Sequence, residues 1–154
     1  MSKSHTASEL EDAYRFFNEI GIIAQLSANQ MQRSLPHSLT LSQFSVLNWF
    51  ARVDTQASPG RLARAFQVTK GAMTNTLRKL GDKKFITIEE DPDSGRSKIV
   101  RMTPTGANAR KAAIAASHPL LEDFLDRFDK HQIAELLPLL QDIRSHLDHQ
   151  REKS

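Results

Sequence analysis

The sequence predicts a mainly α-helical fold that carries one small β-hairpin. Three observations support this prediction. Apolar residues recur at helical spacing over most of the chain, β-branched residues are concentrated only in 85–102, and turn formers divide that segment in two. The order of helix, short helix, tight turn, helix and hairpin over 36–102 is that of a winged helix-turn-helix. We therefore expect this domain to be flanked by long dimerisation helices in 1–35 and 103–154.

The first long helix is predicted over about residues 8–33. Ser8 and Glu11 have the spacing of a capping box, which starts a helix by satisfying its first backbone N–H groups. The apolar residues that follow form a face that is broad for a surface helix on a small domain. Such a face indicates burial against another subunit.

The helical pattern returns after the hairpin. Thr103-Pro104 places proline at the first position of a helix, which is interrupted at His118-Pro119. A last helix is predicted from about Lys130. The apolar residues of about 119–150 complete the predicted dimerisation region.

The central segment contains three shorter helices separated by turn signals. The first of them is predicted to start after the cap Ser42, and Asp54-Thr55-Gln56 is predicted to be a loop. Ser58-Pro59 gives an N-cap followed by proline, which predicts a short helix. Thr69 then caps a helix that runs to about Lys83.

Residues 85–102 are predicted to form the hairpin. Phe85 to Glu89 and Lys98 to Met102 are the strands, and Asp91 to Gly95 between them is dense in turn formers. Strand alternation places Arg96 and Lys98 on one face. A basic hairpin directly after a helix-turn-helix is a wing that can enter the minor groove or bind the DNA backbone.

The positive charge of the chain is concentrated in this region. Residues 1–60 contain four Lys or Arg and five Asp or Glu, residues 61–101 contain ten and five, and residues 102–154 contain seven and eight. The net charges of −1, +5 and −1 give the overall +3. A polyanion-binding surface requires such a cluster, although a solvated charged face would have the same composition.

The helix after Thr69 has the side chains expected of a recognition helix. Lys70, Thr74 and Arg78 form a row at intervals of one turn, beside Asn75. Arginine can pair with guanine and asparagine with adenine, while lysine and threonine can hold phosphates. An ordinary amphipathic helix would share this pattern, and the basic hairpin that follows favours DNA binding. The predicted DNA-binding residues are Ser58, Arg61, Thr69, Lys70, Thr74, Asn75, Arg78, Lys79, Arg96 and Lys98.

The chain resembles the MarR family of bacterial regulators, most strongly over 39–110. The resemblance rests on Leu39-Thr40-Leu41-Ser42-Gln43-Phe44 and on Val100-Arg101-Met102-Thr103-Pro104-Thr105-Gly106. It implies a two-fold dimer that binds double-stranded DNA at a palindromic operator, often represses transcription, and often releases DNA when a small, commonly aromatic, ligand binds. Two residues depart from the family pattern: Asp93 replaces the first basic residue of the wing, and Lys84 stands where glycine is common.

The resemblance also implies a ligand pocket between the DNA-binding lobe and the dimerisation helices. Aromatic and polarisable residues at helical spacing are the candidates for its lining, although the same pattern is that of an ordinary core. These candidates are Phe17, Met31, His37, Phe44, Trp49 and Phe50. No cofactor is predicted.

Other classes of function remain as alternatives. The sequence lacks a Gly-x-Ser-x-Gly elbow, a Gly-rich phosphate loop and a His-Glu-x-x-His motif, so we predict that it is not an enzyme. His146 and His149 lie three residues apart, which leaves a metal-responsive regulator as an alternative, but the hydrophilic surroundings favour a solvated helix face and no metal. The acidic run Glu89-Glu90-Asp91 leaves a winged-helix protein-interaction module as another alternative.

Sequence features also bear on location in the cell. No apolar run approaches the roughly 18 residues that a membrane span needs, and the first residues lack the apolar core of a signal peptide. The chain has no cysteine, which excludes disulfides and thiol-based redox sensing. We therefore expect a cytoplasmic protein.

Overall fold

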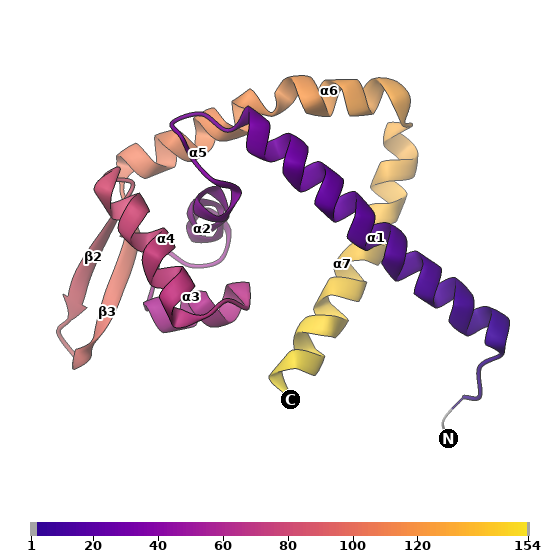
Figure 1. Ribbon diagram of the computed structural model, residues 1–154, viewed down its shortest axis with the longest axis horizontal. Helices are drawn as coiled ribbons and strands as arrows, with labels where there is room; N and C mark the ends of the chain where they lie inside the picture. Colours follow the sequence, from indigo (N-terminus) through magenta and orange to yellow (C-terminus); the bar gives the residue numbers. More distant parts are fainter. Residues whose placement is uncertain (1–2, 154) are drawn as a thin grey trace. The chain divides into compact units, whose positions relative to one another are not determined.

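The computed structural model describes residues 3–153. They fall into two units that divide after Ser117, and each is described by itself. The elements, drawn in Figure 1, are α1 (Ala7–Ser34), α2 (Leu41–Arg52), β1 (Gln56–Ala57), α3 (Pro59–Phe66), α4 (Lys70–Asp82), β2 (Ile86–Asp91), β3 (Ser94–Met102), α5 (Pro104–Ala116), α6 (His118–Arg127) and α7 (Lys130–Glu152).

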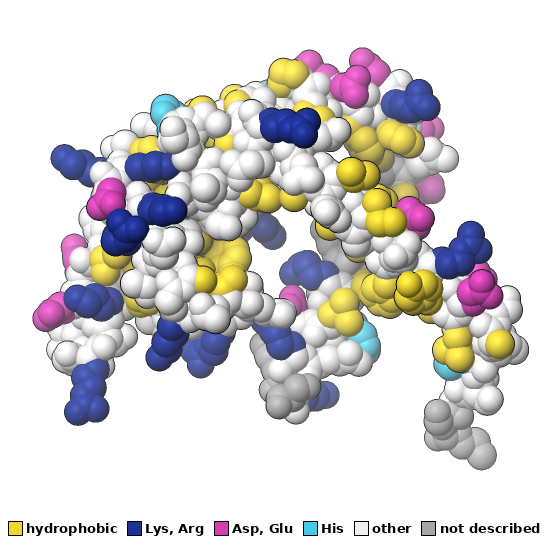
Figure 2. Space-filling view, viewed as in Figure 1, with side chains coloured by type: hydrophobic (Ala, Val, Ile, Leu, Met, Phe, Trp, Pro, Cys, Tyr) yellow, Lys and Arg dark blue, Asp and Glu magenta, His cyan; other side chains and the backbone are white. Residues whose placement is uncertain are grey.

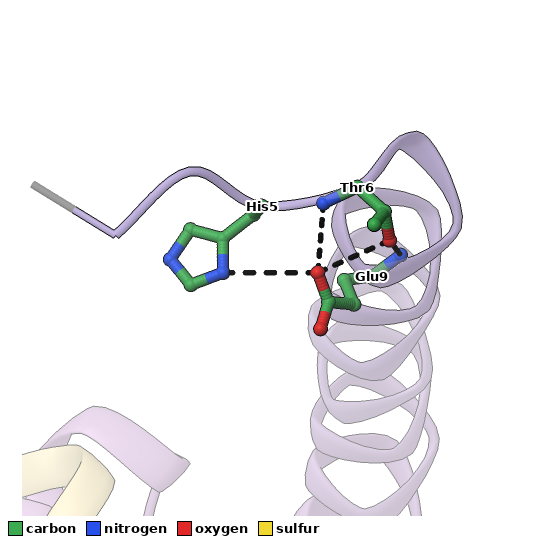
Figure 3. A network of polar contacts seen from close by, with 3 residues as sticks. All are labelled: His5, Thr6 and Glu9. Carbon is green, nitrogen blue, oxygen red and sulfur yellow. Dashed lines mark hydrogen bonds and ion pairs between the residues drawn. The ribbon is translucent and has the colours of Figure 1, made fainter.

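Helix α1 begins earlier than predicted, so the prediction of Ser8 as its cap was wrong. Thr6 is the N-cap: its Oγ1 accepts from the Glu9 N–H at 3.2 Å, and Glu9 Oε2 accepts from the Thr6 N–H at 2.7 Å (Figure 3). His5 Nδ1 lies 4.0 Å from the same carboxylate oxygen. Two overlapping capping boxes compete here, and the earlier one allows the helix to gain two residues.

Helix α2 also begins earlier, with Thr40 rather than Ser42 as its cap. Thr40 Oγ1 accepts from the Gln43 N–H at 3.2 Å, and Gln43 Oε1 accepts from the Thr40 N–H at 3.3 Å. Gln32, near the end of α1, accepts from the Leu41 N–H at 2.6 Å. This glutamine satisfies an N–H of the first turn of α2, so tertiary contacts help to determine where that helix starts.

The predicted starts of α3 and α4 are confirmed. Ser58 Oγ accepts from the Arg61 N–H at 3.1 Å, and Thr69 Oγ1 accepts from the Ala72 N–H at 3.1 Å. Between the two helices, Gln67 has φ 53°, in the left-handed region that ends α3 sharply. A tight helix-turn-helix results.

The sheet contains a strand that the sequence did not predict. Its strands are all antiparallel in the order β1-β3-β2, and β1 pairs Gln56 with Arg101 and Ala57 with Val100. Two residues are too few to show an alternating pattern, so the sequence predicts a loop at Gln56. The hairpin itself is confirmed, but its strands extend further than predicted, until Asp91 pairs with Ser94.

The core of the first unit lies among α2, α3, α4, the sheet and α5. Helix α5 contributes Ala109 and Ala113. Fully burying a leucine contributes about 1.5–3 kcal/mol, so these contacts hold α4 firmly beside the hairpin. The largest fully buried hydrophobic side chains are Leu47, Leu62, Leu77, Leu80, Val46 and Val100.

The Thr103–Gly106 segment joins α5 to the turn before β2. Thr103 Oγ1 donates to the Lys84 carbonyl at 2.7 Å and accepts from the Gly106 N–H at 3.0 Å. A Cβ at Gly106 would lie 2.0 Å from the Phe85 carbonyl oxygen. This position therefore requires glycine, which gives a physical reason for the Thr-Pro-Thr-Gly motif.

The long helices differ from this core. None of the described side chains of α1, α6 and α7 is buried, although all three helices carry large apolar residues. In Figure 2 such side chains are open at the surface of α6 and α7. Within residues 3–153, no helix is both long and apolar enough to cross a membrane.

Candidate nucleic-acid interface

Helix α4 presents the predicted polar face to solvent. Its opposite face is buried through Met73, Leu77 and Leu80. Lys70, Thr74, Asn75 and Arg78 are exposed. The recognition-type face is thus free, while the rest of the helix is anchored in the core.

A hollow of about 330 Å³ lies where the first turns of α3 and α4 meet the wing. It brings together five predicted residues from three elements: Ser58, Lys70, Thr74, Arg96 and Lys98. Figure 2 shows Lys and Arg side chains gathered at the lower edge of this unit, around the hairpin tip and α3. Two helix N-termini and three cations around one hollow create a positive potential that suits phosphate oxygens.

The hydroxyl groups in this region already have backbone partners. Ser58 and Thr69 accept from N–H groups of α3 and α4, respectively. Each hydroxyl can still donate its own hydrogen, because a serine or threonine side chain both accepts and donates. Both residues therefore position the two helices and leave an O–H donor at the surface.

Arg61 does not join the group around the hollow. Its Nη1 donates to Asp54 Oδ2 at 2.6 Å, and its guanidinium lies 5.1 Å from the Trp49 ring centroid. The hydrogen bond from Arg61 lowers the pKa of Asp54 below its ordinary value. Arg61 would have to leave this carboxylate to reach a phosphate.

Lys83, at the end of α4, contacts α2 and the segment before it. Lys83, which sequence reasoning did not single out, donates through Nζ to the Ser38 carbonyl and to Gln43 Oε1, each at 2.8 Å. Partial burial, together with the nearby Lys79, lowers the pKa of Lys83. Lys83 ties the end of α4 to the start of α2, whereas Lys79 remains exposed.

Arg78 and Asn75 are in contact on the outward face of α4. Arg78 Nη2 donates to Asn75 Oδ1 at 2.9 Å, and Arg78 Nη1 lies 3.6 Å from Asp82 Oδ2. The sequence predicted that these two residues share a face, but spacing alone gives no sign of a hydrogen bond between them.

Arg101 supports the wing from within the sheet. Its Nη1 donates to Glu89 Oε2 at 3.1 Å and its Nη2 donates to Gln56 Oε1 at 2.7 Å. The side chain therefore links the three strands. Glu89, which suggested a protein-binding role, has an arginine partner in the same sheet.

The turn before the wing explains one departure from the family pattern. Lys84 has φ 61°, in the left-handed region that glycine adopts without steric cost. The Lys84 N–H donates to the Gly81 carbonyl at 2.9 Å, which holds the turn. The chain thus keeps the backbone geometry of a glycine position with a lysine side chain.

The six candidate pocket residues lie in different surroundings. Phe50 is part of the buried core, and Trp49 and Phe44 pack against that core. Phe17 is half exposed on α1. His37 lies edge-on to Phe85, with ring centroids 6.1 Å apart, and Met31 is partly buried.

The C-terminal histidines have other partners. His149 Nδ1 is 2.8 Å from the Ser145 carbonyl oxygen, and His146 Nε2 is 3.0 Å from Gln150 Nε2. Among the residues that the structure describes, no three His, Cys, Asp or Glu side chains are grouped to hold a metal ion.

Sequence comparison relates the chain to known regulators. The family model of MarR matches residues 37–97. The HTH-type transcriptional regulator ML2140 of Mycobacterium leprae is 30% identical over 117 residues, which cover 75% of this chain and 81% of that protein. The HTH-type transcriptional regulator YdgG of Bacillus subtilis is 33% identical over 95 residues, which cover 58% of this chain and 62% of that protein.

Solved structures have the same fold. The transcriptional regulator BldR from Sulfolobus solfataricus superposes with a TM-score of 0.77 at 25% identity, covering 95% of this chain and 99% of BldR. A mutant MarR from E. coli, complexed with operator DNA, superposes with a TM-score of 0.69 at 22% identity, covering 91% and 99%. The winged fold, the exposed α4 and the sequence matches agree: the chain belongs to the MarR family of DNA-binding transcriptional regulators and is not an enzyme.

Proposed function

We propose that the chain is a homodimeric repressor that binds a palindromic operator and responds to a small aromatic effector. Residues 36–102 form the DNA-binding domain, and the helices in 1–35 and 103–154 form the dimer. The observation that carries the proposal is the hollow at α3, α4 and the wing, where cations from separate segments surround one site beside the free face of α4.

The hollow suggests how the contacts with DNA are divided. Lys70, Lys98 and the Ser58 hydroxyl, which line the hollow, would contact phosphates, and Arg96 would enter the minor groove. Thr69, Lys79 and Arg61 are further phosphate candidates. Thr74, Asn75 and Arg78 face outward from α4, where they can reach base edges in the major groove.

The dimer has support in the exposed apolar residues of the long helices. On α1, Tyr14 is 70% exposed and Ile23 is 61% exposed. A DNA-binding protein seldom leaves such a surface uncovered, and a second copy of the chain would cover it. Two recognition helices in a two-fold dimer would contact half-sites about one helical turn apart, roughly 10 base pairs.

The effector has support in an apolar hollow of about 280 Å³ between α2 and α4. Leu41, Val46, Phe66 and Met73 contribute to its lining. A ligand there would touch the recognition helix directly and could change its position. A panel of aromatic acids tests this: a compound that binds should raise the thermal unfolding temperature and release DNA, and stabilisation without release would exclude an effector role for that compound.

The experiment that tests DNA recognition is selection of bound sequences from randomised duplexes at near-physiological salt. Enrichment of a palindrome is expected, and Lys98→Ala should weaken binding to all duplexes about equally. Arg52→Ala, a matched loss of charge on α2 away from the hollow, should change binding little. Salt-sensitive retention without a consensus would contradict the operator, and no retention would favour a protein-interaction module.

The proposed repression needs a separate test in cells. A reporter gene carries the selected palindrome across its promoter. Expression should fall when the protein is present and recover with Arg78→Ala. Increased expression would identify an activator instead.

A further inference from the structure

The contact between Asn75 and Arg78 limits which base edges α4 can recognise. Arginine carries only donors, so the Asn75 amide must present its oxygen to Arg78 and its nitrogen elsewhere. The 2.9 Å hydrogen bond thus determines the orientation of the amide. Neither side chain is buried, so both can contact a partner molecule without moving the core.

This orientation matters because asparagine reads adenine with both ends of its amide. The oxygen accepts from adenine N6 and the nitrogen donates to adenine N7. Beside Asn75 Oδ1, the guanidinium of Arg78 already supplies N–H donors. Asn75 Oδ1 keeps a second lone pair, but an adenine amino group approaching it would also lie against the N–H donors of the Arg78 guanidinium, which repel it. Guanine instead offers the acceptors O6 and N7 to those donors.

We propose that Asn75 and Arg78 form one reading unit in which the guanidinium donors dominate, and that this unit selects guanine and not adenine. Arg78 contacts the base and Asn75 is a positioning residue that holds its guanidinium. This inference rests on the proposed function, since it assumes that α4 enters the major groove of an operator. It differs from the simpler prediction that each residue reads a base of its own.

Asp82 holds the other end of the same guanidinium. It lies one turn beyond Arg78, and the two side chains are 70% and 62% exposed. An ion pair this exposed contributes little to folding stability. Its effect is instead to orient the Arg78 guanidinium. Asp82→Asn should therefore reduce the base preference at the same operator position as Asn75→Ala, by a smaller factor.

The test compares sequence selection from randomised duplexes by the full-length protein and its variants. Wild type should enrich a palindrome with guanine at one position of each half-site. Asn75→Ala and Arg78→Ala should both reduce the preference at that position, by roughly tenfold for the arginine variant. The double variant should be no less selective than Arg78→Ala, because the two residues act as one unit.

A conservative variant separates positioning from loss of structure. Asn75→Asp keeps an oxygen for Arg78 but removes the amide donor, so the guanine preference should be retained while the added charge weakens binding to every duplex. Thermal unfolding of all the variants should match wild type, since both side chains are exposed. Loss of the preference in Asn75→Asp would overturn the positioning role.

Three other outcomes would overturn the inference, and they are distinguishable. If Asn75→Ala reduces the base preference at a different position, at which wild type prefers adenine, the two residues read separate bases. The proposed function then still stands. If Asn75→Ala leaves the preference at every position unchanged, Asn75 neither reads a base nor positions Arg78, and the proposed function again stands. If wild type enriches no consensus, the proposed operator recognition fails and the reading unit fails with it.

Discussion

The lobe built from α2 to α5 and the long helices α1, α6 and α7 are both rich in large apolar residues, but only the lobe buries them. Leu80 in α4 is fully buried, whereas Leu26 in α1 is 60% exposed. Both leucines belong to amphipathic patterns that look alike in the sequence. The lobe completes its own core, and the long helices present apolar surface that the proposed dimer would cover.

The largest expected effect comes from truncating a leucine in the lobe. Leu80→Ala removes buried methyl groups and leaves a cavity, so the free energy of unfolding should fall by about 2–5 kcal/mol. The matched variant Leu26→Ala should cost much less at high dilution. Chemical denaturation at several protein concentrations checks both, and equal losses at high dilution would contradict the difference between the two regions.

Two glycines test the same contrast in backbone packing. Gly106→Ala places a Cβ 2.0 Å from the Phe85 carbonyl oxygen, and overpacking of this kind should cost about 1–3 kcal/mol or more. Gly21, in α1, has nothing within 4 Å of its Cβ position, so Gly21→Ala should stabilise the helix by about 0.5–1 kcal/mol. Thermal unfolding measures both. A Gly106→Ala variant as stable as wild type would show that the start of α5 does not pack against the Phe85 carbonyl.

A third prediction addresses the proposed dimer. Ile23→Asp places a charge on the exposed apolar face of α1, and an unpaired charge in an interface should raise the dimer dissociation constant by at least roughly tenfold. Gln25→Asp makes a similar change on the other side of the same helix and should have a smaller effect. Analytical ultracentrifugation measures both, and an unchanged dimer in Ile23→Asp would place the interface elsewhere.

Local signals explain why much of the lobe could be predicted. Ser58-Pro59 and Thr69 start α3 and α4 as expected, because a cap depends only on its own turn. Where two capping boxes overlap, the sequence does not choose between them, and Thr6 was missed for that reason. The strand β1 could not be found either, because its two residues become a strand only by pairing with β3.

The candidate site was predictable in composition but not in its contacts. The sequence identified the residues around the hollow, since helical and strand periods determine which side chains share a face. It could not show that Arg61 is paired with Asp54, because that contact spans a turn whose geometry has no sequence signature. The role of Lys83 could not be predicted either, because its partners lie some forty residues away in the chain.

The smallest expected effect is a gain in stability at the turn between α4 and β2. Lys84 has φ 61°, a backbone conformation that costs an L-residue about 1–2 kcal/mol. Glycine adopts this conformation without that cost, but its greater freedom in the unfolded chain offsets about 0.5–1 kcal/mol of the gain in stability. Lys84→Gly should therefore raise the free energy of unfolding by about 0.5–1 kcal/mol.

Lys84→Ala is the control, because it removes the charge but keeps the strained Cβ. If the alanine variant gains as much stability as Lys84→Gly, charge repulsion among the nearby lysines, and not backbone strain, is the cause. If only the glycine variant gains, the lobe tolerates a strained lysine beside the wing. Measuring the DNA affinity of Lys84→Gly would then show whether that lysine also serves binding, since a stabler protein with weaker affinity would indicate a contact with DNA.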